Sequence, residues 1–243
     1  MKYGRRLTML VMLCIILLMG SGCGKKDVYT VAFIHENPPY IYKDGEQWRG
    51  LTVDLLDAMA AAEHWQYELV LLEEDKLDAR VAKGTVDGVL SPGEKRLKDY
   101  EPTDSYADTR VCIAAREGIQ APDALADVAN KRIGVYKYSD VLDVPLAHRD
   151  KYGYFLKTYE TMSDLKRGLV DGEVDYVFDD QLRVNALERD GLTLREGYTK
   201  TLDTGVVISV PKVNDRFISL FNKGLISLVN DGTYEKIMNQ YRD

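Results

Sequence analysis

Short apolar runs alternate with amphipathic stretches along most of the chain. The runs Tyr29–Ile34 and Tyr67–Leu72 predict strands. Between them, Thr52–His64 carries apolar residues at helical spacing, with Thr52 itself as a candidate N-cap. Leu77–Lys83 predicts a second helix that ends before a glycine, and Arg132–Tyr136 begins a similar series further on. This alternation predicts an α/β protein with mixed, mainly parallel sheets.

A helix–glycine–strand unit occurs twice in the chain. The segments Leu77–Ser91 and Leu165–Asp179 share leucine, valine, glycine and aspartate positions when they are aligned around Gly84 and Gly172. Such a recurrence predicts two lobes of similar build, each of about 100 residues. A chance repeat is the alternative, because many α/β proteins contain this unit.

The first residues are typical of a secretory signal. Basic residues precede the apolar run Leu7–Met19, and small residues then lead to Cys23. The run is shorter than the about 20 residues that a membrane-spanning helix needs. The small residues before the cysteine resemble a bacterial lipobox. We therefore expect residues 1–22 to be a lipoprotein signal peptide, Cys23 to be the lipidation site and residues 23–27 to be a tether. A plain secreted protein and an uncleaved anchor are the alternatives.

Composition and charge exclude several classes of protein. With 243 residues, 45% of them hydrophobic, the chain is neither low-complexity nor disordered in bulk. A net charge of −7 disfavours a nucleic-acid-binding surface. Three cysteines and three scattered histidines form no dense ligand cluster, so we expect no metal, no cofactor and no disulfide framework. Cys112 is expected to be a small buried hydrophobic residue.

Charged residues of opposite sign follow the strands of the two repeated units. In open α/β sheets, ligands bind beyond the carboxyl ends of strands. Arg96 follows the first of these strands, and Asp179 and Asp180 end the second. A ligand held between the lobes would meet a cation on one side and anions on the other. This polarity suits a zwitterion such as a free amino acid, since arginine matches a carboxylate in bidentate fashion.

Six short motifs then follow one another along the chain. They are Pro38-Pro39-Tyr40, Gly50–Leu55, Ser91–Arg96, Asp104-Ser105-Tyr106, Ile133-Gly134-Val135 and Asp231–Tyr234. In this order, and behind a signal peptide, they resemble the extracytoplasmic solute-binding proteins of the polar amino acid ABC transporter family, from about Val28 to Asp243.

The resemblance implies a type II, two-lobed periplasmic-binding-protein-like fold. Lobe 1 would comprise residues 28–105 plus 209–243, and lobe 2 would comprise residues 111–203. Two hinge strands at residues 106–110 and 204–208 would let the lobes close on a ligand.

The resemblance also implies roles for four ligand-binding residues. Arg96 would grip the ligand carboxylate with Ser91 beside it, Ser139 would add a donor from lobe 2, and Asp180 would accept the ligand ammonium. Each has a structural alternative. Arg96 could form a surface ion pair with Glu94 or Asp99, Asp180 could be a helix N-cap, and Ser91 could be a turn residue.

Several positions depart from the family pattern. Asn37 stands where an aromatic platform is usual, Glu74 stands at a wall position that is often apolar, and Asp140 follows Ser139. We expect Glu74, Asp140 and Asp179 to make the side-chain pocket acidic, which favours a polar or cationic ligand. Against this, Ile34 stands where some binders of basic amino acids carry Asp, and solvated rim groups are the alternative for all three acids. Tyr40, Tyr136 and Tyr138 are further candidates for the pocket wall.

The resemblance implies a binding protein for amino-acid transport and not an enzyme. The chain would be a monomeric, periplasmic-type lipoprotein, anchored through palmitate or a related lipid to the extracytoplasmic side of the cell membrane. It would deliver a free amino acid to the permease of an ABC transporter. Two alternatives stay open: a sensory or partner-presenting lipoprotein with a degenerate pocket, and a cyclohexadienyl dehydratase-like enzyme with Glu74 as general acid or base.

Overall fold

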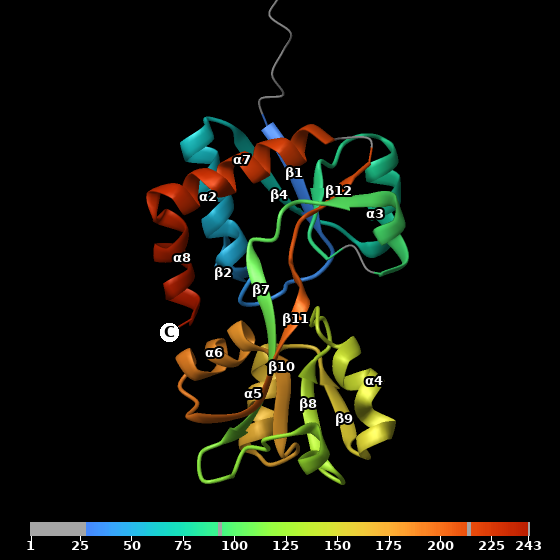
Figure 1. Ribbon diagram of the computed structural model, residues 1–243. Coiled ribbons are helices and arrows are strands. Elements are labelled where there is room, and N and C mark those ends of the chain that lie inside the picture. Colours follow the sequence, from blue (N-terminus) through green and yellow to red (C-terminus); the bar gives the residue numbers. More distant parts are fainter. Residues whose placement is uncertain (1–27, 92–93, 213–214, 243) are drawn as a thin grey trace, which may run out of the picture.

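The computed structural model describes residues 28–91, 94–212 and 215–242. These residues form two α/β lobes that are joined by long strands (Figure 1). The predicted signal peptide, Cys23 and the tether lie outside the described residues. Within the described ranges, no helix has both the length and the apolar character that crossing a membrane requires.

The first lobe is a five-stranded mixed sheet with helices packed against it. The strand order is β4 (Gln66–Leu71), β1 (Val28–Phe33), β5 (Gly88–Val89), β12 (Ser209–Pro211) and β6 (Tyr100–Pro102). Strand β1 pairs in parallel with β4 and β5, and β12 pairs antiparallel with β5 and β6. The remaining elements of this lobe are the ribbon β2 (Tyr42–Asp44) and β3 (Gln47–Arg49), the helices α2 (Leu51–Glu63), α3 (Glu74–Ala82), α7 (Asp215–Asp231) and α8 (Thr233–Arg242), and the 3₁₀ turn η1 (Glu94–Asp99).

The second lobe has a five-stranded sheet of its own. Its strand order is β11 (Leu194–Val206), β7 (Ala107–Arg116), β10 (Tyr176–Asp180), β8 (Arg132–Tyr136) and β9 (Phe155–Tyr159). Strands β10, β8 and β9 are parallel, whereas β7 pairs antiparallel with β10 and β11. The helices are α4 (Asp143–Tyr152), α5 (Met162–Val170) and α6 (Gln181–Arg189), with the short turn η2 (Leu125–Val128). The prediction of an α/β fold with mixed sheets is therefore confirmed.

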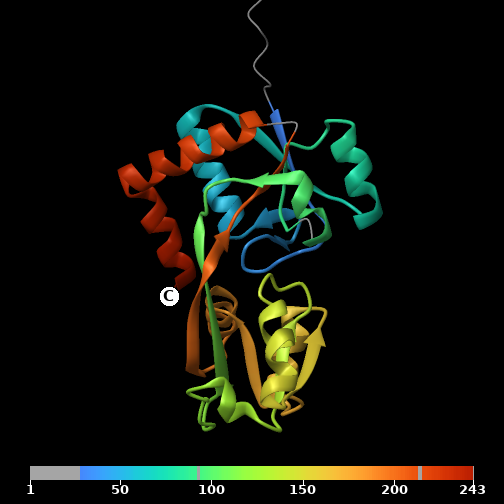
Figure 2. The ribbon, with the colours of Figure 1, turned by 45° about the vertical axis from the view of Figure 1, so that its right-hand side comes forward.

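Strands β7 and β11 run side by side from the second sheet toward the first lobe in both views (Figures 1 and 2). Their pairing reaches Val206 opposite Ala107, with register shifts that include the step between Thr201 and Gly205. Beyond these strands the chain enters β6 on one side and β12 on the other, so both lobe connections lie at the same edge.

The two repeated units adopt the same local structure. Helices α3 and α5 are each followed by a glycine in the left-handed region, Gly84 at φ 64° and Gly172 at φ 71°. The aspartate directly before the next strand then accepts a hydrogen bond from the backbone of a neighbouring strand. Asp87 accepts the N–H of Thr30 at 2.8 Å, and Asp175 accepts the N–H of Arg132 at 2.7 Å. The repeat therefore marks equivalent places in the two lobes.

Helix α2 does not begin with a capping threonine. Gly50 holds the N-cap position at φ 120°, and the first helical N–H groups donate to backbone carbonyls of the preceding loop. The hydroxyl of Thr52 instead shares a 2.8 Å hydrogen bond with that of Tyr106. The predicted cap is wrong because a glycine backbone conformation brings the Pro39 and Tyr40 carbonyls onto the helix terminus.

Buried apolar clusters fill both lobes. In the first lobe, α2, α7 and β1 contribute to a cluster in which Phe217 contacts Tyr29, Trp65 and Phe221. In the second lobe, the sheet has an apolar cluster on each face. Cys112 belongs to one of them and is fully buried, as predicted. Burial also raises the pKa of its thiol.

Candidate functional site

A cavity of about 520 Å³ lies between the two lobes. Its size falls within the range of small-molecule sites. The first lobe contributes His35, Ser91, Leu97 and Ser209, the second contributes Lys137, Tyr138, Ser139, Asp140 and Asp143, and the strands β7 and β11 with the segment after β11 contribute Thr109 and residues 204–207. Three of the predicted site residues, Ser91, Ser139 and Asp140, therefore line one cavity.

Beside this cavity, α6 begins at the end of β10. Asp180 is its N-cap and accepts the N–H of Arg183 at 3.0 Å, as the structural alternative for Asp180 anticipated. The Arg183 side chain is fully buried and turns back onto the strand end. There its guanidinium pairs with Asp179, 2.9 Å away, and with Asp180. Helical geometry places residues three and four apart on one face, so this pairing follows from local sequence.

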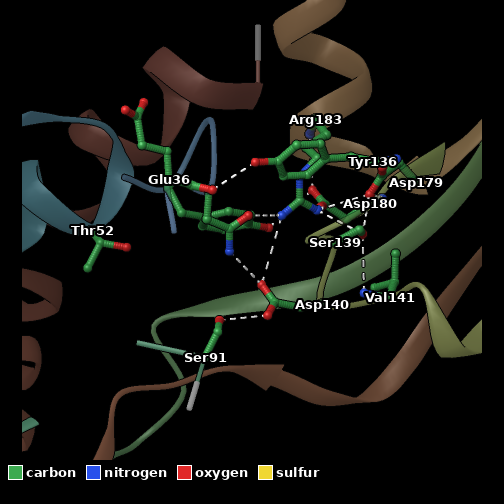
Figure 3. Close-up of polar contacts among 12 residues, drawn as sticks. Glu36, Thr52, Ser91, Tyr136, Ser139, Asp140, Val141, Asp179, Asp180 and Arg183 are labelled. Atoms are coloured by element: carbon green, nitrogen blue, oxygen red, sulfur yellow. Dashed lines mark hydrogen bonds and ion pairs between the residues drawn. The ribbon is translucent and has the colours of Figure 1, made fainter. Parts of the chain in front are cut away.

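The Arg183 guanidinium also contacts the first lobe. Its Nη2 donates to Oδ1 of Asn37. Its central carbon lies 5.4 Å from the ring centroid of Tyr40 and 5.4 Å from that of Tyr136, one ring from each lobe. The Tyr40 hydroxyl donates to Asp180 at 3.1 Å. One guanidinium thus joins side chains of both lobes. Figure 3 shows Arg183 beside Tyr136, Asp179 and Asp180.

Asp179 orders the loop that carries Ser139. Its carboxylate accepts the Ser139 hydroxyl at 2.5 Å, the Tyr136 N–H at 3.2 Å and its own neighbour's N–H, that of Asp180, at 2.9 Å. The side chain has no exposed surface. Asp179 therefore influences the cleft by positioning Ser139 and Arg183. It is not a solvated group on the pocket rim.

Asp140 bridges the cleft from the second lobe to the first. It accepts Nδ2 of Asn37 at 2.9 Å and the hydroxyl of Ser91 at 2.7 Å. Its side chain stays 39% exposed, so it can also meet a ligand. Figure 3 shows Asp140 between Ser91 and the Arg183 cluster.

Arg96 lies outside this cluster. It donates to Asp78 at 2.7 Å and to Glu74 at 3.2 Å, both of which belong to α3. Neither Arg96 nor Glu74 is part of the cavity lining, although the adjacent Leu97 is. The structure therefore brings Arg96 together with Glu74 and Asp78 of α3, neither of which was considered as a partner of Arg96 in the sequence.

The cleft holds more acid than base. Asp140, Asp179 and Asp180 surround the single guanidinium of Arg183. Burial raises the pKa of Asp180 to about 6, against the opposing effect of Arg183, and Asp179 adds to the rise. Burial also lowers the pKa of His35, which leaves a neutral ring stacked 4.3 Å from that of Tyr138. No group of three or more metal-ligating side chains is found among the described residues.

The raised pKa of Asp180 predicts an unusual pH dependence of stability. Because the folded state holds this proton up to about pH 6, and the unfolded state only to about 3.9, the contribution of Asp180 is favourable at low pH and is lost as the pH rises through 6. The groups that face Asp180 are Asp179, Asp140 and Arg183, together with the hydroxyl of Tyr40.

An asparagine at position 180 can still accept the N-cap hydrogen bond, but its side chain does not titrate. The free energy of unfolding of Asp180→Asn, relative to wild type, should therefore rise by on the order of 2 kcal/mol from about pH 4 to pH 7. Urea denaturation at both pH values measures this difference. A difference that stays constant with pH would contradict the assignment.

Two residues of the site were not predicted from the sequence: Arg183 at the centre of the buried cluster and His35 in the cavity lining. Arg183 carries a usable signal, because it follows Asp179 and Asp180 at the spacing of one helical turn. His35 carries none, since its partner Tyr138 lies in the other lobe. The candidate wall residues Tyr40 and Tyr136 flank Arg183, and Tyr138 lines the cavity.

Comparison with known families gives one match that spans the described chain. The model of the bacterial extracellular solute-binding proteins, family 3, matches residues 29–243. Among curated proteins, the L-arginine-binding protein of Pseudomonas aeruginosa is 26% identical over 227 residues, covering 84% of this chain and 83% of that protein.

Solved structures share the fold. Substrate-binding domain 2 of GlnP from Lactococcus lactis, in the open conformation, aligns with a TM-score of 0.70 and 25% identity over 91% of this chain and 98% of that one. An ancestral arginine-binding protein bound to arginine aligns with a TM-score of 0.72 and 22% identity over 90% of this chain and 100% of that one. These are two-lobed binding proteins, and the comparison confirms the predicted fold class.

Proposed function

The chain belongs to the bacterial extracellular solute-binding proteins, family 3, and from this premise we propose that it captures a free amino acid between its lobes for an ABC importer. The observation that carries the proposal is the cavity itself. Its walls come from both lobes and from the strands that connect them. Closure of such a cleft expels water, which strengthens each polar contact with the ligand.

The residues that line the cavity are the proposed first contacts of the ligand. Ser91 and Ser139 offer hydroxyl groups, and Asp140 offers a partly exposed carboxylate. Arg96 is the family's expected partner of the ligand carboxylate. In this protein Arg96 already donates to Asp78 and Glu74, so a ligand carboxylate would compete with these two acids for it. Hinge movement within residues 106–110 and 204–208 is proposed to admit the ligand.

We propose an amino acid with a cationic side chain as the ligand class. Three carboxylates against one guanidinium leave the cleft acidic. The relative in Pseudomonas aeruginosa is named an L-arginine-binding protein, which is consistent with this charge. Asp140 and Asp143 are the carboxylates that border the cavity. Asp140 also contacts Asn37 and Ser91 across the cleft, so we propose that it selects for a cation.

Replacing Asp140 with asparagine should therefore weaken binding of arginine and lysine by at least about tenfold, the usual size of a lost charge-assisted hydrogen bond. Binding of glutamine should change by less than about threefold, because it brings no side-chain charge. Isothermal titration of each ligand provides the test. Asp150→Asn is the matched control, since this carboxylate is exposed on α4 and faces Arg149. Equal losses for arginine and glutamine would remove Asp140 as the selective group.

Anchoring and delivery complete the proposal. A lipid on Cys23 would hold the protein on the extracytoplasmic side of the membrane, and the closed form would dock on a permease. No catalytic role is assigned, because Glu74, the general acid or base considered in the sequence, is paired with Arg96 outside the cavity lining.

One observation favours a second candidate, a sensory or partner-presenting protein that binds no amino acid. Ser91, Asp180 and Arg96 each already bond to a side chain of this chain. A degenerate pocket predicts that no amino acid raises the melting temperature. Transport predicts a clear rise with at least one class, since a ligand at 100 times its dissociation constant adds about 2.7 kcal/mol.

A further inference from the structure

The groups that surround the Arg183 guanidinium are of the kinds that bind a cationic ligand. Its acceptors are two carboxylates, a hydroxyl and an amide oxygen, those of Asp179, Asp180, Ser139 and Asn37. All four acceptor residues are buried, and the Arg183 side chain has no exposed surface. A guanidinium with this many acceptors is held as tightly in position as a bound ligand would be.

The first lobe also contacts the Arg183 guanidinium, although neutralising its charge does not require these contacts. Asp179 and Asp180 already pair with the guanidinium from within the second lobe. Asn37 and the Tyr40 ring nevertheless reach it from the first lobe, and the Tyr136 ring lies at the same 5.4 Å distance as that of Tyr40. The site thus closes around a cation from both lobes, as the cleft is proposed to close around its ligand.

We propose that Arg183 is a tethered occupant of a cation subsite in the cleft. The side chain fills the place beside Asp180 that a free cationic group would otherwise take. Removing it would open a subsite for a free guanidinium or for the side chain of arginine. Arg183 is therefore a specificity-determining residue, which denies Asp180 to the ligand and leaves Asp140 to select for charge.

The part of this proposal that concerns ligand choice rests on the amino-acid-binding function proposed above. The part that concerns the subsite does not, because a small guanidinium probe requires only the local acceptors. The two parts can therefore fail separately, and the experiment has one arm for each.

The first arm tests the subsite by chemical rescue of the full chain. Arg183→Ala should melt well below wild type, because two buried carboxylates lose their cation. Guanidinium chloride at about 20 mM should raise the melting temperature of this variant by about 3 °C or more. At that concentration its denaturing action is negligible, as denaturation needs molar amounts. Sodium chloride at equal concentration should give no such rise.

Arg189→Ala is the matched control, since Arg189 lies on the same helix but is exposed and donates to the backbone of Tyr241. This variant should show no rescue by guanidinium. If Arg183→Ala does not fold, Arg183→Ala with Asp180→Asn removes one of the stranded charges and keeps the helix cap, and the same rise is expected in that variant. No rise in either variant, or an equal rise in the Arg189→Ala control, would overturn the subsite.

The second arm measures ligand choice by isothermal titration. Arg183→Ala should bind arginine at least about tenfold more tightly than wild type, whereas binding of glutamine should stay within about threefold. Guanidinium rescue without a gain for arginine would keep the subsite and overturn its role in specificity. Rescue in a chain whose wild type binds no amino acid would instead contradict the proposed function alone.

Discussion

Replacing Gly50 with alanine is expected to lower the free energy of unfolding by on the order of 3 kcal/mol. Gly50 has a φ of 120°, a region that side chains with a Cβ rarely adopt. An added Cβ would stand 2.5 Å from the carbonyl oxygen of Pro39 and 2.5 Å from that of Tyr40. These are backbone atoms, so relief requires the loop to move.

The same loop carries two residues of the cleft. Leu51 donates its N–H to the Pro39 carbonyl at 3.0 Å, and Thr52 donates to that of Tyr40 at 2.9 Å. Moving these carbonyls would displace Tyr40 and Asn37 from Arg183. We therefore expect Gly50→Ala to weaken ligand binding as well as stability.

Urea denaturation and ligand titration of the same variant measure both effects. Gly45→Ala is the matched control, because Gly45 also has a positive φ, 62°, but an added Cβ there meets nothing within 4 Å. That substitution should lower the free energy of unfolding by only about 1 kcal/mol, the strain of a residue with a Cβ in the left-handed region. Equal costs at the two positions would show that the contact with the loop carbonyls has no effect.

Replacing Phe217 with alanine should lower the free energy of unfolding by about 3 to 5 kcal/mol, the usual loss for a fully buried aromatic side chain. Phe217 has no exposed surface and its ring centroid lies 5.6 Å from that of Tyr29 and 6.2 Å from that of Trp65. Its neighbours belong to β1, the loop before β4 and α7, so the cavity would open at the centre of the first lobe.

Phe155→Ala is the control for this prediction. Phe155 starts β9 in the second lobe and is 64% exposed, so its removal should change stability by no more than about 0.5 kcal/mol. Thermal denaturation of the two variants compares them directly. A loss below about 1 kcal/mol for Phe217→Ala would contradict the described core packing.

Much of the fold could be predicted from the sequence because it depends on local pattern. The strand Arg132–Tyr136 has the predicted bounds, and the run predicted at Tyr29–Ile34 forms β1, shifted by one residue. Helix α3 begins at Glu74, earlier than the predicted Leu77. Its first turn contains acidic residues, which stabilise a helix N-terminus without contributing to an apolar pattern.

The site could be predicted only in part. Ser91 and Ser139 do line one cavity, as the resemblance to a family of binding proteins suggested, and Asp140, which departs from the family pattern, lines it as well. The partner of Arg96 could not be foreseen, because it depends on how α3 packs over the turn that carries Arg96. The contact between Arg183 and Asn37 joins residues 146 positions apart, and such pairs follow from the approach of the lobes and not from local pattern.

The most direct test of the central claim is isothermal titration of the protein with arginine, lysine, histidine, glutamine and leucine. The proposed function predicts saturable binding of at least one cationic amino acid, tighter than that of leucine by tenfold or more, which is about 1.4 kcal/mol. Absence of binding across the five ligands would contradict capture of an amino acid between the lobes. Leucine binding that equals or exceeds arginine binding would contradict the assignment of a cationic ligand.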